Sequence, residues 1–486
     1  MSGQSAPGRL TADQPIASWA AARTRRGSWP KRLAVLAILL VALGVRVWEV
    51  QRTSPYRPIN DGQSYLTLAS QVAHHGDYLD NHAPRSGAGG SIGPTTYFPP
   101  GYPYFLAAVD LVTGNTSGGG QAVHAARLAT AALGAVSVGL IGLVAFEAFG
   151  LGVAMIAMLL AALYPPLIEL SGTPYSENLL IPLELAAVWT GLRASRAANP
   201  FPLLALAGIF AGLATLTHQN GVVILLPLII CAVQSARRVT GTGARAVTSR
   251  GRGRRSAATT LAGPVVLLAC AALTIAPWTI RNAIVLHRFI PVSDEMGITL
   301  AGTYNPSSAA DSQIPYRWKY YGAVPAYASI ARASLHLTEP ALSSRLTTAA
   351  LRYVRSHPLA PAEAAYHNFR RLLELEGSAA WRISGASIGL SVATTRIGVY
   401  AFWVVAALAV AGLFTRRARR APDWLWAVPI LLALSVILVN AETPRFRAPI
   451  DPYLIMLAAC AAASLAARLL RQPRLRRAQP RAHPAR

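Results

Sequence analysis

The chain has 486 residues, of which 53% are hydrophobic and only 13% are charged, with a net charge of +25. This composition excludes an ordinary water-soluble globular protein. The basic residues form short blocks between apolar runs with almost no aromatic residues among them, so the charge does not indicate nucleic-acid binding. The three cysteines, Cys231, Cys270 and Cys460, lie inside apolar runs, which excludes a disulfide framework.

Apolar runs of about 17 to 25 residues, the length that crosses a bilayer as an α-helix, recur along the chain. We predict an all-α fold: a polytopic membrane helical bundle of about ten spans with helical outer-face loops. The predicted spans are 33–50, 124–147, 151–170, 178–195, 201–217, 220–235, 258–278, 396–414, 423–440 and 450–469. The chain then divides into a basic tail (1–32), the first span (33–50), an outer loop (51–121), spans two to seven (122–278) with a basic loop at 236–257, an outer helical segment (279–395), the last three spans (396–470) and a second basic tail (471–486).

The basic blocks predict the orientation of these spans. Lys and Arg beside membrane spans collect on the cytoplasmic side, and a cytoplasmic N-terminus puts every strongly basic block there. The first span has no convincing cleavage site after it, so we predict a retained signal anchor. Residues 51–121 and 279–395 then lie outside. FPPGYPYFLAAVDLVTG in the first predicts an interfacial helix, and the second predicts amphipathic helices around a proline break.

An acidic residue follows the first span closely, in the stretch PINDGQSYLTLA at 58–69. The stretch predicts a helix through Tyr65, and it leaves two interpretations of Asp61. In the first, Asn60 or Asp61 caps the amides at the start of the helix. In the second, Asp61 is a catalytic base held at the membrane surface, with Tyr65 beside it in a substrate-binding site.

The same outer loop carries HHGDYLDNH at 74–82, whose His and Asp side chains are chemically suited to a divalent metal. They lack a regular ligand spacing on a helix, so a solvated loop is the alternative. We therefore assign no metal ligands and no cofactor, and a divalent metal stays open as an alternative.

Two further clusters lie at predicted turns on the outer side. Glu169 and Glu177, in YPPLIELSGTPYSENLL, fall at a span boundary where an unpaired carboxylate is costly. Glu177 is a candidate binding residue, although Ser176 or Glu177 can instead cap a helix. His218, in LTHQNG, can donate to a phosphate or sit in a hydrated turn.

Three arginines stand at the outer boundary against the trend of the positive-inside rule. Arg281 follows a span in APWTIRNAIVLHRF, and Arg445 and Arg447 precede one in AETPRFRAPIDPY. The arginine fork is suited to phosphate, so these residues predict an anionic partner. The structural alternative is pairing with Asp451, Glu442 or lipid headgroups.

The ordered set of motifs resembles the C-type superfamily of membrane glycosyltransferases, in particular bacterial proteins similar to protein O-mannosyltransferases and aminoarabinose transferases. The resemblance rests on Asp61 after the first span, FPPGYPYFLAAVDLVTG, YPPLIELSGTPYSENLL, APWTIRN with RFIPVS, and PRFRAPIDPYL. Two positions differ from the family pattern. Gly62 follows Asp61 where a second carboxylate is common, and His218 and Gln219 stand where many relatives have Arg-Pro.

The resemblance implies transfer of a hexose or pentose from a polyprenyl-phosphate-linked donor to an acceptor hydroxyl, usually with inversion, on the outer face of the bacterial plasma membrane. Asp61 would be the base, and the acceptor a glycan, lipid or protein. Arginine at the bilayer edge suits the departing phosphate on chemical grounds as well. The alternatives are a lipid or solute transporter, including a flippase, and a noncatalytic protein of envelope assembly.

Overall fold

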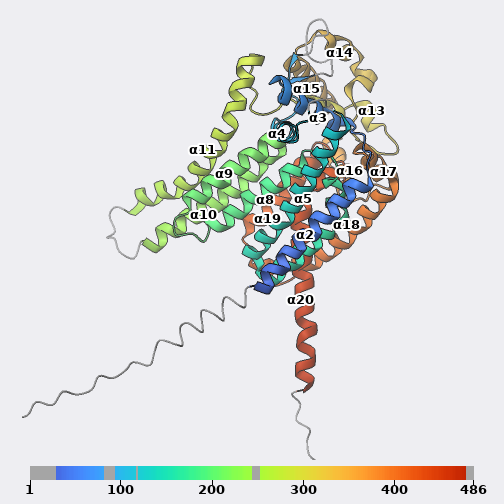
Figure 1. Ribbon diagram of the computed structural model, residues 1–486. Coiled ribbons are helices and arrows are strands. Elements are labelled where there is room, and N and C mark those ends of the chain that lie inside the picture. The colour runs from blue at the N-terminus through green and yellow to red at the C-terminus, as the bar shows by residue number, and fades with distance from the viewer. Residues whose placement is uncertain (1–28, 81–92, 116–118, 244–251, 478–486) are drawn as a thin grey trace, which may run out of the picture.

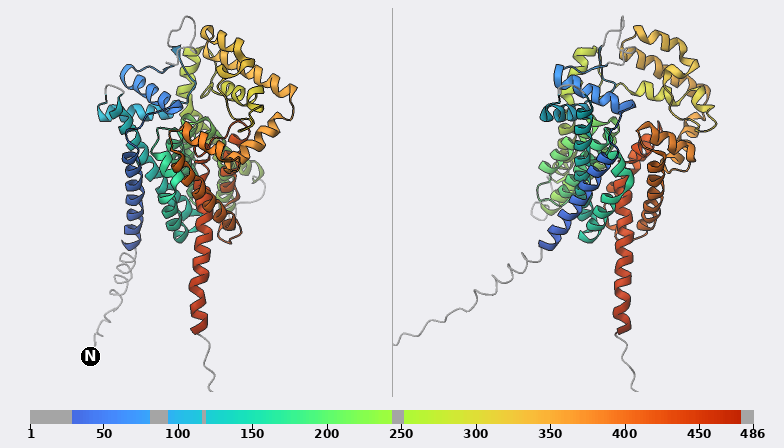
Figure 2. Two further views of the ribbon diagram at one scale, coloured as in Figure 1. Left: turned by 90° about the vertical axis from the view of Figure 1, so that its right-hand side faces the viewer. Right: turned by 45° about the vertical axis from the view of Figure 1, so that its right-hand side comes forward.

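The structure is a computed structural model, and it describes residues 29–80, 93–115, 119–243 and 252–477. The predicted all-α fold is confirmed: long apolar helices form a bundle, and shorter helices cover one end of it (Figure 1). The N-terminus of α2 (Trp29–Arg52) and the C-terminal end of α20 (Asp451–Arg477) lie at the other end (Figure 2). We call these the cap end and the tail end. The basic stretches 1–28, 244–251 and 478–486 lie outside the described residues.

Each of the ten predicted spans is helical. Six described helices are long and apolar enough to cross a membrane alone, and α6 with α7 adds a seventh if the pair is one bent span. α9 and α19 are apolar but shorter, and α8 carries three charged residues. Besides α2 and α20, the bundle comprises α5 (Gly120–Phe149), α6 (Leu151–Leu163), α7 (Pro165–Ser171), α8 (Glu177–Ala194), α9 (Phe201–Thr217), the 3-10 turn η2 (Gln219–Ile224), α10 (Leu225–Gly243), α11 (Arg252–Leu286), α18 (Val392–Leu413) and α19 (Asp423–Ile437).

A break in the third predicted span brings a polar turn to the cap end. α6 ends at Leu163 and α7 begins at Pro165, with an angle of 57° between them. Pro165 lacks the N–H that a continuous helix would use, so it fits only as the start of a new helix. The chain can therefore turn after α7 and present residues 172–176 before α8 begins.

One span runs further than the sequence predicts. The predicted seventh span ends at residue 278, but α11 continues to Leu286. The sequence TIRNAIVL contains no helix breaker, and the helix ends only before His287, whose φ of 53° is left-handed. Arg281 is consequently on a helix, where the prediction placed it in the loop after a span.

The two segments predicted to lie outside form the cap end together. The predicted helix through Tyr65 is α3, the predicted interfacial helix is α4, and the predicted amphipathic pair is α15 and α16, separated by residues 357–359. The cap helices are α3 (Asn60–His75), α4 (Gly101–Thr113), α12 (Met296–Thr303), α13 (Pro306–Ala309), α14 (Ala328–Ala333), α15 (Glu339–Ser356), α16 (Ala360–Leu372) and α17 (Ser378–Ser387). Two short strands, β1 (Leu79–Asp80) and β2 (Gly93–Pro94), pair antiparallel beside them.

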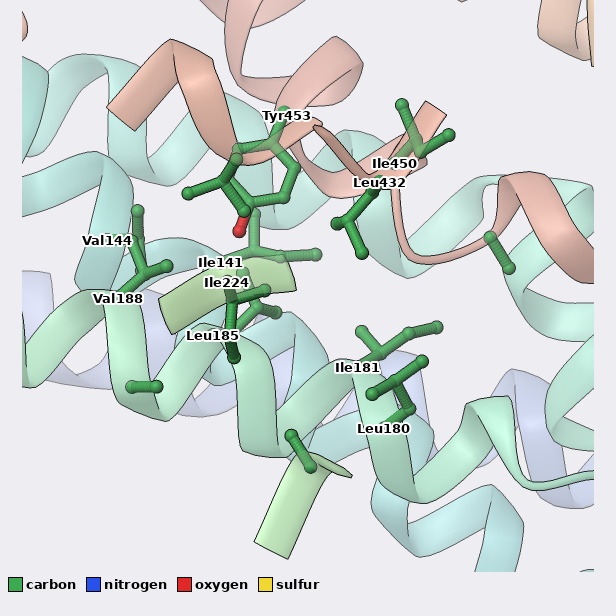
Figure 3. Close-up of a cluster of buried hydrophobic side chains, with 14 of the residues drawn as sticks. Ile141, Val144, Leu180, Ile181, Leu185, Val188, Ile224, Leu432, Ile450 and Tyr453 are labelled. Atoms are coloured by element: carbon green, nitrogen blue, oxygen red, sulfur yellow. The ribbon is translucent and has the colours of Figure 1, made fainter. Parts of the chain in front are cut away.

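Three groups of buried apolar side chains are found among the described residues, and the two larger ones hold these parts together. The larger one runs through the bundle and includes α3 and α4, and Figure 3 shows its centre, where Tyr453 of α20 lies among side chains of α5 and α8. The smaller one lies within the outer segment, between residues 298 and 364. Lipid tails are as apolar as leucine, so close packing holds the bundle, whereas the outer segment has its own apolar core.

Candidate functional site

The site lies at the cap end, in a cavity of about 770 Å³ between the bundle and the outer segment. Its walls come from α3, the turn before α8, η2, α12 and the loops around residues 317 and 445. Segments that are hundreds of residues apart in the sequence therefore meet here. The side chains that matter below are Asp61, Tyr65, Tyr175, Glu177, His218, Glu295, Trp318 and Arg445.

Asp61 enters the cavity from the first turn of α3. The capping interpretation is wrong, because Ile59 precedes the helix and no side chain bonds its free amides. Instead, the Asp61 carboxylate accepts a hydrogen bond from Arg445, with 2.5 Å between Oδ2 and Nη1. The Asp61 side chain is 32% exposed, so it can meet a ligand in the cavity. Its place in the first turn also suits the positive end of the helix dipole.

Arg445 joins two carboxylates that are far apart in the sequence. It lies on the 3-10 turn η7 (Arg445–Arg447), and its Nε donates to Oε1 of Glu177 at 2.7 Å. Its guanidinium packs on the rings of Tyr175 and Phe446, 4.8 and 4.9 Å from their centroids. An arginine stacked between rings and bonded on two edges has little rotational freedom, so Arg445 fixes the direction of the Asp61 carboxylate.

Of the two carboxylates bonded to Arg445, Glu177 is the buried one. Its side chain is only 1% exposed, and it lies in the first turn of α8. The capping alternative is wrong here as well, because no side chain caps α8. The Ser176 hydroxyl instead accepts a hydrogen bond from the Tyr65 hydroxyl at 3.2 Å. Glu177 therefore acts as the anchor that holds Arg445 in the cavity wall.

Tyr65 and His218 complete the surroundings of the ion pair. Burial raises the pKa of Tyr65 well above its usual value, so the phenol stays neutral and serves as a hydrogen-bond donor. His218 accepts a hydrogen bond from the Asn220 amide at Nδ1, which places the proton of the neutral ring on Nε2. That nitrogen lies 3.9 Å from Oε1 of Glu177. The imidazole thus presents an N–H at the edge of the cavity.

Glu295 is a cavity residue that the sequence analysis missed. It precedes α12 directly, and Gln219 donates to its Oε2 at 3.4 Å. Burial, followed by the nearby carboxylates of Asp61 and Glu177, raises the pKa of Glu295 to about 8. Burial also raises the pKa of Glu442 in the same wall. The available signal was the acidic pair in SDEMG, directly before an apolar helix in a chain with few acidic residues.

The raised pKa of Glu295 has a measurable effect on stability. Between the usual glutamate value of 4.5 and about 8, the folded chain keeps a proton that the unfolded chain releases. The stability of wild type relative to Glu295→Gln should therefore fall as the pH rises through this window, and level off above it. Thermal unfolding of both proteins from pH 5 to pH 9 measures the difference. A difference that does not vary with pH would contradict the assignment.

Arg281 and Arg447 lie away from the cavity. Arg281 donates to the carbonyl oxygens of Thr95 and Tyr78 at 2.8 and 3.1 Å, and it packs on Trp278. Arg447 is buried and donates to Glu374 at 2.7 Å, with Asp451 at 3.3 Å from its Nε. The structural alternative of pairing with Asp451 is thus the arrangement observed for Arg447. Of the three arginines, only Arg445 lines the cavity.

The described residues contain no group of three or more His, Cys, Asp or Glu side chains arranged to hold a metal ion. In the HHGDYLDNH stretch, His74 contacts the Asn115 carbonyl oxygen at 3.0 Å, and His82 lies outside the described residues. The Asp61 and Glu177 carboxylates are instead joined through Arg445.

The architecture defines a class, the polytopic helical membrane proteins with a cavity at one end of the bundle. Residues 98–247 match the family model of dolichyl-phosphate-mannose-protein mannosyltransferase. No curated protein matches the chain by sequence.

Solved structures extend the comparison. The oligosaccharyltransferase AglB of Archaeoglobus fulgidus, in complex with an inhibitory peptide and a dolichol-phosphate, is 16% identical with a TM-score of 0.52. The match covers 94% of this chain and 53% of AglB, so this chain spans about half the length of that relative. The apo oligosaccharyltransferase of the same organism gives 16% identity, coverage of 93% and 52%, and a TM-score of 0.53. The Pmt1–Pmt2 protein O-mannosyltransferase complex of S. cerevisiae, bound to the sugar donor, is 17% identical, with coverage of 59% and 37% and a TM-score of 0.41.

At these identities, the likeness to the archaeal enzyme is one of fold. The chain has the fold of the C-type (GT-C) glycosyltransferase superfamily. The resemblance found in its sequence is confirmed.

Proposed function

We propose that this protein transfers a sugar from a polyprenyl-phosphate-linked donor to an acceptor hydroxyl. The observation that carries the proposal is the meeting of Asp61 and Arg445, 384 residues apart in the sequence, in the wall of the cavity. A base for the acceptor and a cation for the donor phosphate are thereby set side by side. This is the pair of groups that transfer from a phosphate leaving group requires.

The cavity offers groups for each part of the donor. Apolar side chains of η2 and α19, among them Val222 and Val436, line it and suit the first isoprene units. Arg445 uses Nε and Nη1 for its two carboxylates, and Nη2 has no hydrogen bond in the described part of the chain. That N–H group and the His218 Nε2–H are suited to the phosphate. Trp318 also lines the cavity, and its aromatic ring is suited to contact with a sugar.

The proposed reaction is a single displacement. Asp61 takes the proton of the acceptor hydroxyl as its oxygen attacks the anomeric carbon. The bond from that carbon to the phosphate oxygen breaks, and the charge left on the lipid phosphate is stabilised by Arg445. Attack opposite the leaving group inverts the anomeric configuration. The sugar is a hexose or a pentose, and the acceptor is a hydroxyl of a glycan, lipid or protein.

Sugar transfer is tested with purified protein and radiolabelled polyprenyl-phosphate sugars, with the matching nucleotide sugar as a control donor. We expect labelled acceptor and free polyprenyl phosphate from the lipid-linked donor alone. Transfer from the nucleotide sugar only would overturn the proposal. Movement of an intact donor across a vesicle membrane would identify a transporter or flippase. If the protein shows neither transfer nor transport, the noncatalytic role in envelope assembly is the alternative that remains.

We further propose that the cap end faces outward from a bacterial plasma membrane, because this orientation puts the basic blocks on the cytoplasmic side. Ser344 on α15 is exposed at the cap end, and Ala198 is exposed in the turn between α8 and α9. In a cysteine-free background, an impermeant maleimide should label Ser344→Cys in intact cells and Ala198→Cys only after permeabilisation. The reverse pattern would refute the orientation.

A further inference from the structure

A second large cavity lies at the tail end, opposite the proposed catalytic site. Its volume is about 1230 Å³, and it is formed where α5, α18, the 3-10 turn η6 (Ala418–Arg420) and α20 meet. No step of the proposed sugar transfer uses it. We call it the tail pocket.

The tail pocket gathers positive charge without a matching negative charge. Five arginines line it, namely Arg416, Arg417, Arg419, Arg420 and Arg468, and no Asp or Glu is among the lining residues. Within the described ranges, none of the five forms an ion pair with a carboxylate. The acidic side chain on α5, Glu147, is already paired with Arg193 and Arg196. Like charges held this close repel one another, so an anion bound between them would be stabilised.

The neutral polar side chains of the pocket do not offset this positive charge. The Thr415 hydroxyl donates to the Gly412 carbonyl oxygen, and the Ser464 hydroxyl donates to the Cys460 carbonyl oxygen. Arg419 donates to the Phe414 carbonyl oxygen at 3.1 Å, which leaves its remaining N–H groups for a ligand. The pocket is therefore rich in donors.

The rest of the lining is apolar and partly or fully exposed. Phe414, at the end of α18, is 73% exposed, and Leu465 on α20 is 59% exposed. Phe149 and several alanines of the same three helices continue this surface. A ligand that satisfies both parts of the pocket has an anionic head and an apolar body, which a free phosphate ion lacks.

We propose that the tail pocket binds an anionic phospholipid, with the phosphate between the arginines and the acyl chains along Phe414 and Leu465. The lipid would join α5, α18 and α20 at the tail end. α18 packs along α20, and α20 begins four residues after Arg447. Lipid binding should consequently stabilise the folded chain as a whole.

The test uses the purified full chain in a neutral detergent, titrated with phosphatidylglycerol, phosphatidylcholine or inorganic phosphate. We expect phosphatidylglycerol to raise the Tm in a saturable manner and to remain bound in native mass spectrometry. Phosphatidylcholine and inorganic phosphate should have little effect. Equal stabilisation by phosphatidylcholine would overturn the proposal, and equal stabilisation by inorganic phosphate would identify a free-anion site and overturn it as well.

Variants locate the effect. The triple substitution Arg416→Gln, Arg419→Gln and Arg420→Gln should lower the affinity for phosphatidylglycerol at least tenfold. The matched control, Arg345→Gln with Arg352→Gln and Arg355→Gln, removes the same charge from exposed positions on α15 at the cap end and should bind like wild type. If the triple variant does not fold, the single change Arg468→Gln should weaken binding severalfold. Unchanged binding in the pocket variants, or equal loss in the control, would refute the assignment.

Discussion

Asp61→Asn is expected to lower sugar transfer by about 10² to 10⁴-fold, the usual contribution of a positioned general base. The amide oxygen can still accept the hydrogen bond from Arg445, so the local structure and the folding of the chain should be preserved. What the variant loses is the ability to take a proton from the acceptor. The measurement is the transfer rate from a polyprenyl-phosphate sugar at saturating donor, together with the Tm.

The matched control for this variant is Asp77→Asn. Asp77 is exposed beyond the end of α3 and does not line the cavity. Asp77→Asn therefore removes the same charge from the same outer loop without changing the site. Near-normal transfer by Asp61→Asn, or equal losses in the two variants, would show that Asp61 is not the base.

Arg445→Lys is expected to cost transfer on the order of 10²-fold, as loss of one charge-stabilising donor typically does. Lysine keeps the charge, but one ammonium group cannot reproduce the fork that joins Glu177, Asp61 and a ligand. Arg445→Ala is less informative because it leaves the buried Glu177 carboxylate unpaired, a change that costs about 3–5 kcal/mol of stability. Arg445→Lys should therefore lower the transfer rate strongly and the Tm only slightly.

Arg447→Lys provides the comparison on the same turn. Arg447 also lies between two carboxylates, but Glu374 and Asp451 are outside the cavity lining. Arg447 is 1% exposed against 7% for Arg445, so the same change should cost more stability at Arg447. We expect a lower Tm and nearly unchanged transfer by the protein that stays folded. Equal losses of transfer in both Lys variants would mean that Arg445 supports the fold and does not stabilise the departing phosphate.

The helices and the site differ in how far the sequence predicts them. Hydrophobic length picked out ten segments that are all helical, six of which are long and apolar enough to cross a membrane alone, because a span must meet the length requirement within one local stretch. Asp61 was singled out for a similar reason, as a carboxylate placed directly after a span, and it lines the cavity. Arg445 was a candidate as well, but its contact with Asp61 was not predicted, because no local pattern states that residues 61 and 445 meet.

The arginines show the same limit. Arg445 and Arg447 look alike in the sequence PRFRAP, yet a 3-10 turn has three residues per turn, so side chains two positions apart point in different directions. One reaches the cavity and the other the interior. Arg281 was predicted to lie in a loop after a span, but α11 continues past it to Leu286. The sequence carries no local signal that distinguishes these two cases.

The two larger apolar cores have a consequence for engineering. Asp61, Glu177 and Arg445 lie on elements that share the larger core with the bundle. Trp318 and Arg317 instead reach the cavity from the segment built around the core between residues 298 and 364. A segment with its own core can be exchanged as a unit with limited disturbance to the helices below it. If the proposed sugar transfer holds, chimeras that graft this segment from a protein of the same fold should change the acceptor preference and leave the Asp61–Arg445 pair in place.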